Sequence, residues 1–255
     1  MKINKLRFIN AAKAMGWHFL GSLVVTCLVA AVVFGVWFPY PYRQLAGGIE
    51  LFFLIMGVDI VCGPLLTLVL FNPAKPKREL LLDLGLVVVL QLAALAYGIW
   101  TVHQARPLYL VHEVDRFKVI ALADIDAAEL AKLSDTLQPQ LFKGPQTVGL
   151  REASKQEREK VMFESVQGGR DYGERPNFYA SYDGVQAAKA YAKAKPLENF
   201  AQKHPDKKAE IEELRAKAGA DAKLLRYLPV VARQDWVAVL SPKGEILGYL
   251  RGDGF

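Results

Sequence analysis

The densest group of titratable side chains in this sequence is His112, Glu113 and Asp115. A histidine beside carboxylates could serve as a general acid–base pair. Adjacent residues of a strand point to opposite faces, however, so we do not expect His112 and Glu113 to share a site. The sequence contains neither an HExxH nor a GxSxG motif, and its glycines form no phosphate-binding loop. We therefore expect a protein that is not an enzyme and that carries no metal or other cofactor.

A second unusual residue is Asp59, which lies deep within a long apolar segment. A carboxylate at that depth of a bilayer is costly unless it is paired, hydrated or protonated. In one interpretation Asp59 is neutral, or bonds to a hydroxyl or to a backbone carbonyl freed near Pro64, and simply holds a helix bundle together. In the other it faces a partner helix or a water-filled pocket. An ion or proton pathway is disfavoured, since one deep ionisable residue makes a poor relay.

Three segments must position these residues, and each is long and apolar enough to cross a bilayer: 17–38, 49–71 and 80–100. About 20 residues at about 1.5 Å each cover the roughly 30 Å of hydrocarbon. Backbone amides in hydrocarbon need internal partners, so we expect helices. The first segment could instead be a cleaved signal peptide. Its apolar stretch is longer than that of a signal peptide, however, and it ends in aromatic residues rather than in a small-residue cleavage site.

The cations around these segments are unevenly distributed. The loop between the first and second segments carries Arg43 alone, whereas the other two flanking regions carry Lys2, Lys5, Arg7, Lys13, Lys75, Lys77 and Arg78. The positive-inside rule then places the N-terminus in the cytoplasm and everything after the third segment outside, which is the periplasm if the membrane is a bacterial inner membrane. We predict a cytoplasmic basic N-terminus (1–16), a three-helix transmembrane domain (17–100) and a periplasmic α+β domain (101–255).

The charge distribution argues against a nucleic-acid-binding protein, and the cysteine content argues against a disulfide-stabilised outer domain. The formal net charge is +6 with a pI near 9.2, but much of the excess flanks the apolar segments, and no basic stripe interleaved with aromatics occurs. We therefore expect no nucleic-acid partner. The two cysteines, Cys27 and Cys62, both lie in the apolar segments, so the outer domain must be held by its core without disulfides.

The pattern of residues 101–255 predicts strands at both ends of the domain and helices between them. A hairpin is expected close to the membrane. Ser154 and Glu157 have capping-box spacing, and Asp124 or Asp126 could cap a shorter helix. The segments rich in Ala, Lys and Glu are expected to be exposed helices. The predicted strands are 108–114, 117–120, 227–232, 236–240 and 245–250, and the predicted helices are 124–133, 154–166, 184–195 and 197–218.

Three separated strings occur in order along the chain: ELFFLIMGVDIVCGPLLT at 50–67, QLAALAYG at 91–98, and ARP at 105–107 followed by EVDRF at 113–117. With the closing strands, these strings resemble the type IV pilin accessory proteins of the TfpX/TfpZ type. The resemblance covers most of the chain. It leaves out the middle, 138–222, whose role the sequence does not assign.

The resemblance implies a non-enzymatic inner-membrane protein that supports the stability or assembly of a cognate pilin. The implied partners are the major type IV pilin, other inner-membrane components of pilus assembly, and membrane lipid. A pilin of this type has an apolar N-terminal helix and a globular head, so we expect the second span to contact the helix and the hairpin to contact the head. The expected partner-binding residues are Glu50, Gly57, Asp59, Gly63, Pro64, Gln91, Arg106, Pro107, Glu113, Asp115, Arg116 and Phe117.

Two other classes fit the same layout. A membrane-anchored extracytoplasmic sensor or ligand-binding domain is the main alternative, although the chain has little cytoplasmic mass to carry an output. A membrane enzyme acting on lipid or glycan would need a polar site near the interface. Arg106, Glu113 and Asp115 are the residues available for one, and no motif supports it.

Overall fold

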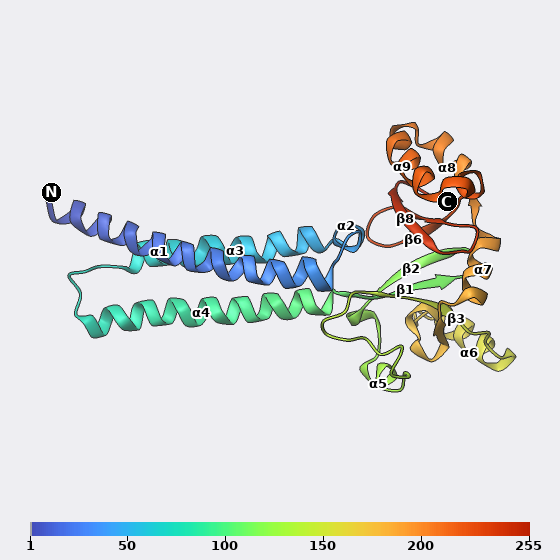
Figure 1. The fold of residues 1–255 in the computed structure, drawn as a ribbon. Helices are drawn as coiled ribbons and strands as arrows, with labels where there is room; N and C mark the ends of the chain where they lie inside the picture. The colour runs from blue at the N-terminus through green and yellow to red at the C-terminus, as the bar shows by residue number, and fades with distance from the viewer. Residues whose placement is uncertain (1) are drawn as a thin grey trace. The chain divides into compact units, whose positions relative to one another are not determined.

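The computed structural model describes residues 2–255, and Met1, the first residue of the predicted cytoplasmic segment, lies outside them. Three long apolar helices precede a mixed α+β domain, as the sequence predicts (Figure 1). The chain divides into two compact units. The helical unit contains the chain up to Val36 and Gly48–Gln104, and the C-terminal domain contains Trp37–Gly47 and Ala105–Phe255.

The helical unit consists of α1 (Lys2–Val32), α3 (Gly48–Leu70) and α4 (Lys77–Gln104). A π-helical turn, Val33–Trp37, continues α1. Helix α3 packs against both α1 and α4. Its buried residues recur every three or four positions, which is the spacing of one helix face: Phe52, Met56, Asp59, Gly63 and Thr67. Many of the remaining large apolar side chains of the unit are exposed, as expected for a surface that meets lipid.

The short connection between the first two spans belongs to the C-terminal domain. Its helix α2 (Tyr42–Leu45) contributes Leu45, which is fully buried, and Tyr42 to the core that also contains Leu228 and Trp236. The carbonyl of Leu45 accepts a hydrogen bond from the backbone N–H of Arg233 at 3.2 Å. The predicted 17–100 domain includes this segment, whereas burial of its apolar side chains draws it into the fold of residues 105–255.

The C-terminal domain is built on an eight-stranded mixed sheet in the order β4-β3-β1-β2-β6-β7-β8, with β5 paired to β6. Five strands were predicted: β1 (Pro107–Glu113), β2 (Arg116–Ala121), β6 (Arg226–Val231), β7 (Trp236–Leu240) and β8 (Ile246–Arg251). The predicted hairpins β1–β2 and β7–β8 are antiparallel, and β2 runs parallel to β6.

Sequence patterns did not predict β3 (Gln146–Leu150), β4 (Tyr179–Ser181) or the two-residue β5 (Lys195–Pro196). Strand β3 lies parallel to β1, with Leu110 opposite Thr147, and β4 pairs with β3. Each of these strands is short, and its partner is distant in sequence. The pairing therefore depends on the tertiary fold rather than on a local pattern.

The helices begin where their capping residues predict. Asp126 caps α5 (Ala127–Leu130) by accepting a hydrogen bond from Ala128 N, and Ser154 with Glu157 forms the capping box of α6 (Lys155–Val166). The predicted exposed helices are α7 (Gly184–Lys193), α8 (Leu197–Lys203) and α9 (Lys208–Ala218), and the prediction was wrong for one face of each. Those faces are buried through Ala187, Ala190, Leu197, Phe200, Ile211 and Leu214.

Candidate functional site

A polar cluster joins the three helices of the helical unit. Its members are His18 and Ser22 on α1, Thr67 on α3 and Gln91 on α4. His18 Nε2 lies 2.6 Å from Gln91 Oε1, and His18 Nδ1 lies 2.6 Å from Thr67 Oγ1. Gln91 Nε2 donates to Ser22 Oγ at 2.8 Å. Because a carbonyl oxygen only accepts, His18 Nε2 carries a proton, and in the neutral imidazole Nδ1 accepts from the Thr67 hydroxyl.

Gln91 was predicted as a site residue, but its partners were not. A signal for them exists in the sequence: His18, Ser22 and Thr26 are polar residues four positions apart in an apolar segment, so they lie on one helix face. Polar groups in hydrocarbon need partners, and this stripe therefore marks the face of α1 that meets other helices.

Asp59 is 7% exposed and lies beside this cluster. Its carboxylate oxygen Oδ1 is buried and has no hydrogen-bond partner among residues 2–255, while its backbone carbonyl accepts from Gln91 Nε2 at 3.4 Å. Asp59 lines a cavity of about 210 Å³ together with His18, Ser22 and Gln91. The apolar part of the lining consists of Gly21, Val25, Val88, Leu92 and Leu95. This geometry fits the interpretation in which Asp59 faces a pocket better than the one in which its carboxyl is bonded near Pro64.

The other predicted residues of α3 fall into two groups. Gly63 and Pro64 are buried, and a Cβ at Gly63 would meet the side-chain amide of Gln91, so this part of the helix already packs within the chain. Gly57 faces open space, and Glu50 lies exposed in the first turn of α3. Of these four positions, only Gly57 and Glu50 thus leave surface for another protein.

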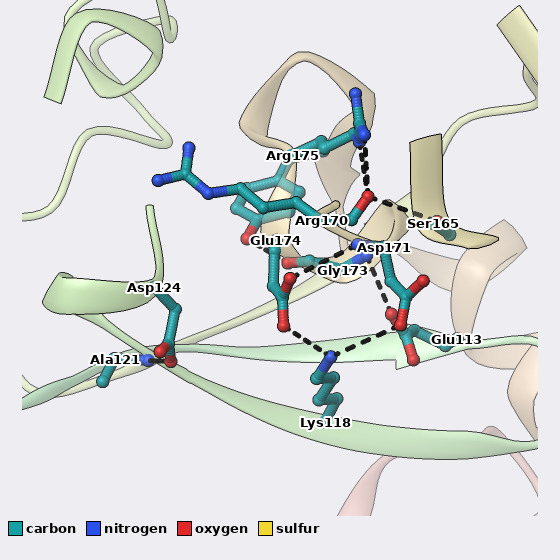
Figure 2. A network of polar contacts seen from close by, with 11 residues as sticks. Glu113, Lys118, Ala121, Asp124, Ser165, Arg170, Asp171, Gly173, Glu174 and Arg175 are labelled. Atoms are coloured by element: carbon teal, nitrogen blue, oxygen red, sulfur yellow. Dashed lines mark hydrogen bonds and ion pairs between the residues drawn. The ribbon is translucent and has the colours of Figure 1, made fainter. Parts of the chain in front are cut away.

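In the C-terminal domain, the β1–β2 hairpin carries a network of charges on one face (Figure 2). Glu113 Oε1 accepts a hydrogen bond from the backbone N–H of Gly173 at 2.8 Å. Lys118 Nζ donates to Glu174 Oε1 at 2.8 Å and lies 4.0 Å from Asp171 Oδ2. Figure 2 shows Lys118 reaching from its strand toward these carboxylates. The network fastens the 3₁₀ turn Tyr172–Glu174 to the hairpin.

Burial and neighbouring charges shift two pKa values in this network. Burial raises the pKa of the Glu113 carboxyl, and Lys118 opposes that shift only in part. Burial lowers the pKa of Lys118, but the hydrogen bond to Glu174 and the nearby carboxylates outweigh it, so the pKa lies above its ordinary value. Lys118 therefore remains a cation, and the network has the character of a structural ion-pair cluster.

The turn of the hairpin is exposed. Asp115 Oδ1 and Arg116 Nε lie 2.8 Å apart, and the Arg116 guanidinium lies 5.0 Å from the ring centroid of Phe255. A surface ion pair of this kind contributes little to stability. Among the predicted hairpin residues, Asp115 and Arg116 are open to a partner, Glu113 is half-buried, and Arg106, Pro107 and Phe117 are buried.

His112 and Glu113 point to opposite faces of β1, as predicted. The His112 ring lies 5.4 Å from the ring of Phe117, and burial lowers the pKa of His112 to about 4. His112 lines a cavity of about 460 Å³, and Glu113 belongs to a different one. The two side chains therefore cannot act as one acid–base pair.

The helices and the sheet define a class, that of membrane-anchored proteins with a C-terminal α+β domain. Comparison with known proteins narrows the class to a family. The family described as fimbrial assembly protein FimB matches residues 6–47. The chain is 33% identical over 256 residues to the fimbrial assembly protein of serogroup I from Dichelobacter nodosus, covering 99% of both chains. It is 32% identical to the serogroup E1 protein over the same share of each chain.

A third relative, the fimbrial assembly protein of serogroups C1 and C2 from Dichelobacter nodosus, is 45% identical over 128 residues, which is 50% of this chain and 98% of the relative. No solved structure matches. The chain belongs to the family of fimbrial assembly proteins, which confirms its resemblance to the type IV pilin accessory proteins.

Proposed function

We propose that this protein is a non-enzymatic inner-membrane assembly factor that supports the stability or assembly of a cognate type IV pilin. The observation that carries this proposal is the similarity, over nearly the whole chain, to proteins named fimbrial assembly proteins. The three apolar helices and the separately folded C-terminal domain support it, because a pilin with an apolar helix and a globular head offers one surface to each.

In the membrane, the pilin helix docks over the cavity that Asp59 lines, whose other lining residues lie on α1 and α4. A buried carboxylate oxygen without a partner favours a neighbouring helix that brings a hydrogen-bond donor, since no bulk water competes there. Gly57 is two residues from Asp59 and therefore lies on nearly the opposite face of α3, where nothing stands within 4 Å of a Cβ placed on it. That face is open to the close approach of another helix.

Outside the membrane, the turn of the β1–β2 hairpin contacts the pilin head through Asp115 and Arg116. This pair is exposed and adds little to the stability of the fold. Exposed charges at an interface mainly set specificity and the rate of encounter. Arg116 and Asp115 are therefore suited to distinguishing a cognate head from others.

The proposed orientation places the N-terminus in the cytoplasm and the C-terminal domain in the periplasm. The lysine and arginine residues within the first 13 positions of the chain, and those at Lys75, Lys77 and Arg78 around the α3–α4 connection, support this orientation. Fusions of a periplasm-dependent reporter to the C-terminus and to the α3–α4 loop test it. Activity from the C-terminal fusion alone is expected, and the reverse pattern would contradict the proposal.

The central experiment is in-cell photocrosslinking from the full-length protein. A photoreactive residue at position 92, where Leu92 is 58% exposed and lines the same cavity as Asp59, and one at position 116 should each yield an adduct with the major pilin. Position 89 is the matched control in the membrane, because Val89 is 63% exposed on α4 and lies outside the site. Equal yields from positions 92 and 89, or no pilin adduct from positions 92 and 116, would contradict the proposed contacts.

Deletion and complementation test the role itself. Loss of the gene should reduce surface pili, and Asp59→Asn or Arg116→Ala variants at normal abundance should restore them only in part. Asn keeps the shape of Asp59 while replacing one carboxyl oxygen by an amide nitrogen that can only donate a hydrogen bond. Full piliation by both variants would exclude these residues from the function, and unchanged piliation on deletion would reject the assembly role.

A further inference from the structure

An exposed loop of the C-terminal domain carries two large apolar side chains followed by a cation. Leu141 is 47% exposed and Phe142 is 74% exposed, and Lys143 is also exposed. Adjacent large apolar side chains that are exposed to solvent commonly mark contact with another surface.

Two hydrogen bonds fix where this loop lies. The carbonyl oxygen of Leu141 accepts from Trp37 Nε1 at 3.0 Å and from Arg106 Nη1 at 3.4 Å. Trp37 and Arg106 are both buried, at 8% and 6% exposure, so the anchor points are rigid parts of the domain. The loop is thus held at one defined corner of its own compact unit.

Chain connectivity places that corner at the membrane surface. Trp37 is the last residue of the first candidate span, and Arg106 follows the end of the third, Gln104, by two residues. One residue of extended chain covers about 3.5 Å, so Phe142 stays close to the level of Trp37. The headgroup region on each side of a bilayer is about 5–7 Å deep, and tryptophan is enriched there.

The chemistry of the loop suits this depth. Leucine and phenylalanine can enter the boundary between headgroups and acyl chains, while a neighbouring lysine reaches lipid phosphates. Arg106 is a buried cation behind the loop, where it donates to the Leu141 carbonyl, and its Nε has no hydrogen-bond partner among residues 2–255. Burial alone accounts for the lowered pKa of Arg106, with no carboxylate contributing.

We propose that the loop Leu141–Phe142–Lys143 inserts into the headgroup region of the bilayer and fastens this corner of the C-terminal domain to lipid. Trp37 and Arg106 hold the loop in position, and Phe142 is its apolar anchor. This contact requires no pilin, because it involves only residues of this chain and lipid.

The test uses the full-length protein in vesicles of phosphatidylcholine and phosphatidylglycerol. Cys27 and Cys62 are replaced by serine, and a single cysteine at position 142 carries an environment-sensitive fluorophore. The matched control is position 163, where Phe163 is 66% exposed on α6. We expect blue-shifted emission at position 142 and quenching by nitroxide-labelled lipid several-fold stronger than at position 163, with the reverse order for aqueous iodide.

A second variant tests the tether. Trp37→Phe keeps an aromatic ring but removes the donor to Leu141, so the label at position 142 should lose part of its lipid quenching while the domain stays folded by circular dichroism. Equal quenching at positions 142 and 163 would overturn the proposal. So would protection of position 142 that appears only when a pilin is added, since the loop would then be a protein contact.

Discussion

His18 Nε2 lies 2.6 Å from Gln91 Oε1, which joins the first and third membrane helices through the middle of the helical unit. The same glutamine donates to Ser22, and the same histidine contacts Thr67. A chain of polar side chains thus bridges all three helices within their apolar segments, where few other polar partners are available.

The bridge predicts that Gln91→Leu destabilises the helical unit. The substitution leaves His18 and Ser22 without their partner, at a cost of about 1–2 kcal/mol for groups of this kind in membrane proteins. Hydrogen exchange of α1 and α4 in the full-length protein measures the loss. Leu90→Ala is the control, because Leu90 is 56% exposed and does not line the cavity. In a double-mutant cycle, His18→Phe and Gln91→Leu should be non-additive, and strict additivity would contradict the bridge.

Gly63 and Gly57 should respond differently to the same added methyl group. A Cβ at Gly63 would meet the Gln91 amide, which would have to leave its bonds to His18 and Ser22, whereas a Cβ at Gly57 meets nothing within 4 Å. We expect Gly63→Ala to cost about 1–3 kcal/mol, as overpacking does. Gly57→Ala should leave the helical unit unchanged or slightly more stable. Thermal melts in detergent compare the two, and equal losses would show that Gly63 has no special contact.

Because Leu45 is fully buried in the core of the C-terminal domain, we predict that the connection between the first two spans stabilises that domain. Leu45→Ala removes a fully buried side chain and should cost about 2–5 kcal/mol. Tyr40→Ala is the control in the same segment, because Tyr40 is 60% exposed. Near-ultraviolet circular dichroism during urea unfolding measures both variants. A neutral Leu45→Ala would mean that the segment does not belong to the core.

Because His112 is buried, we predict that the free energy of unfolding of the C-terminal domain falls as the pH is lowered. Burial lowers the pKa of His112 from 6.5 to about 4, so as the pH falls the unfolded chain binds this proton at a higher pH than the folded chain does. The stabilising effect of the neutral ring is complete above pH 6.5 and is lost as the pH falls to about 4, for a total of at most about 3 kcal/mol. Groups that face His112 take part in this balance, with Asp115 opposing the shift and Lys189 adding to it.

The His112→Phe variant should therefore lose less stability between pH 6.5 and pH 4 than the natural protein. Hydrogen exchange of the β1 amides across this range is the measurement. His204→Phe serves as the comparison, because the His204 ring is bonded to the exposed C-terminal segment through the Asp253 carbonyl. An unchanged pH slope in His112→Phe would show that the acid step has another source.

Much of the architecture is local, and local features can be predicted from sequence. The three membrane helices follow from runs of apolar residues, because hydrocarbon forces the backbone to bond within each run. The hairpin β1–β2, the capping box at Ser154 and the hairpin β7–β8 follow from residues close together in the chain. Asp59, Gln91, Asp115 and Arg116 could be singled out as candidate site residues from their types and places.

Only the tertiary structure determined which side chains those residues contact. Only the packing of α1 and α4 on α3 brings His18 to Gln91, which is 73 residues away, and leaves Asp59 facing a cavity. Strand β3 forms because β1 supplies a parallel partner, and Leu45 is buried because β6 and β7 surround it. Such contacts depend on how distant segments pack together to bury apolar surface. The spacing of residues within one segment does not encode that packing.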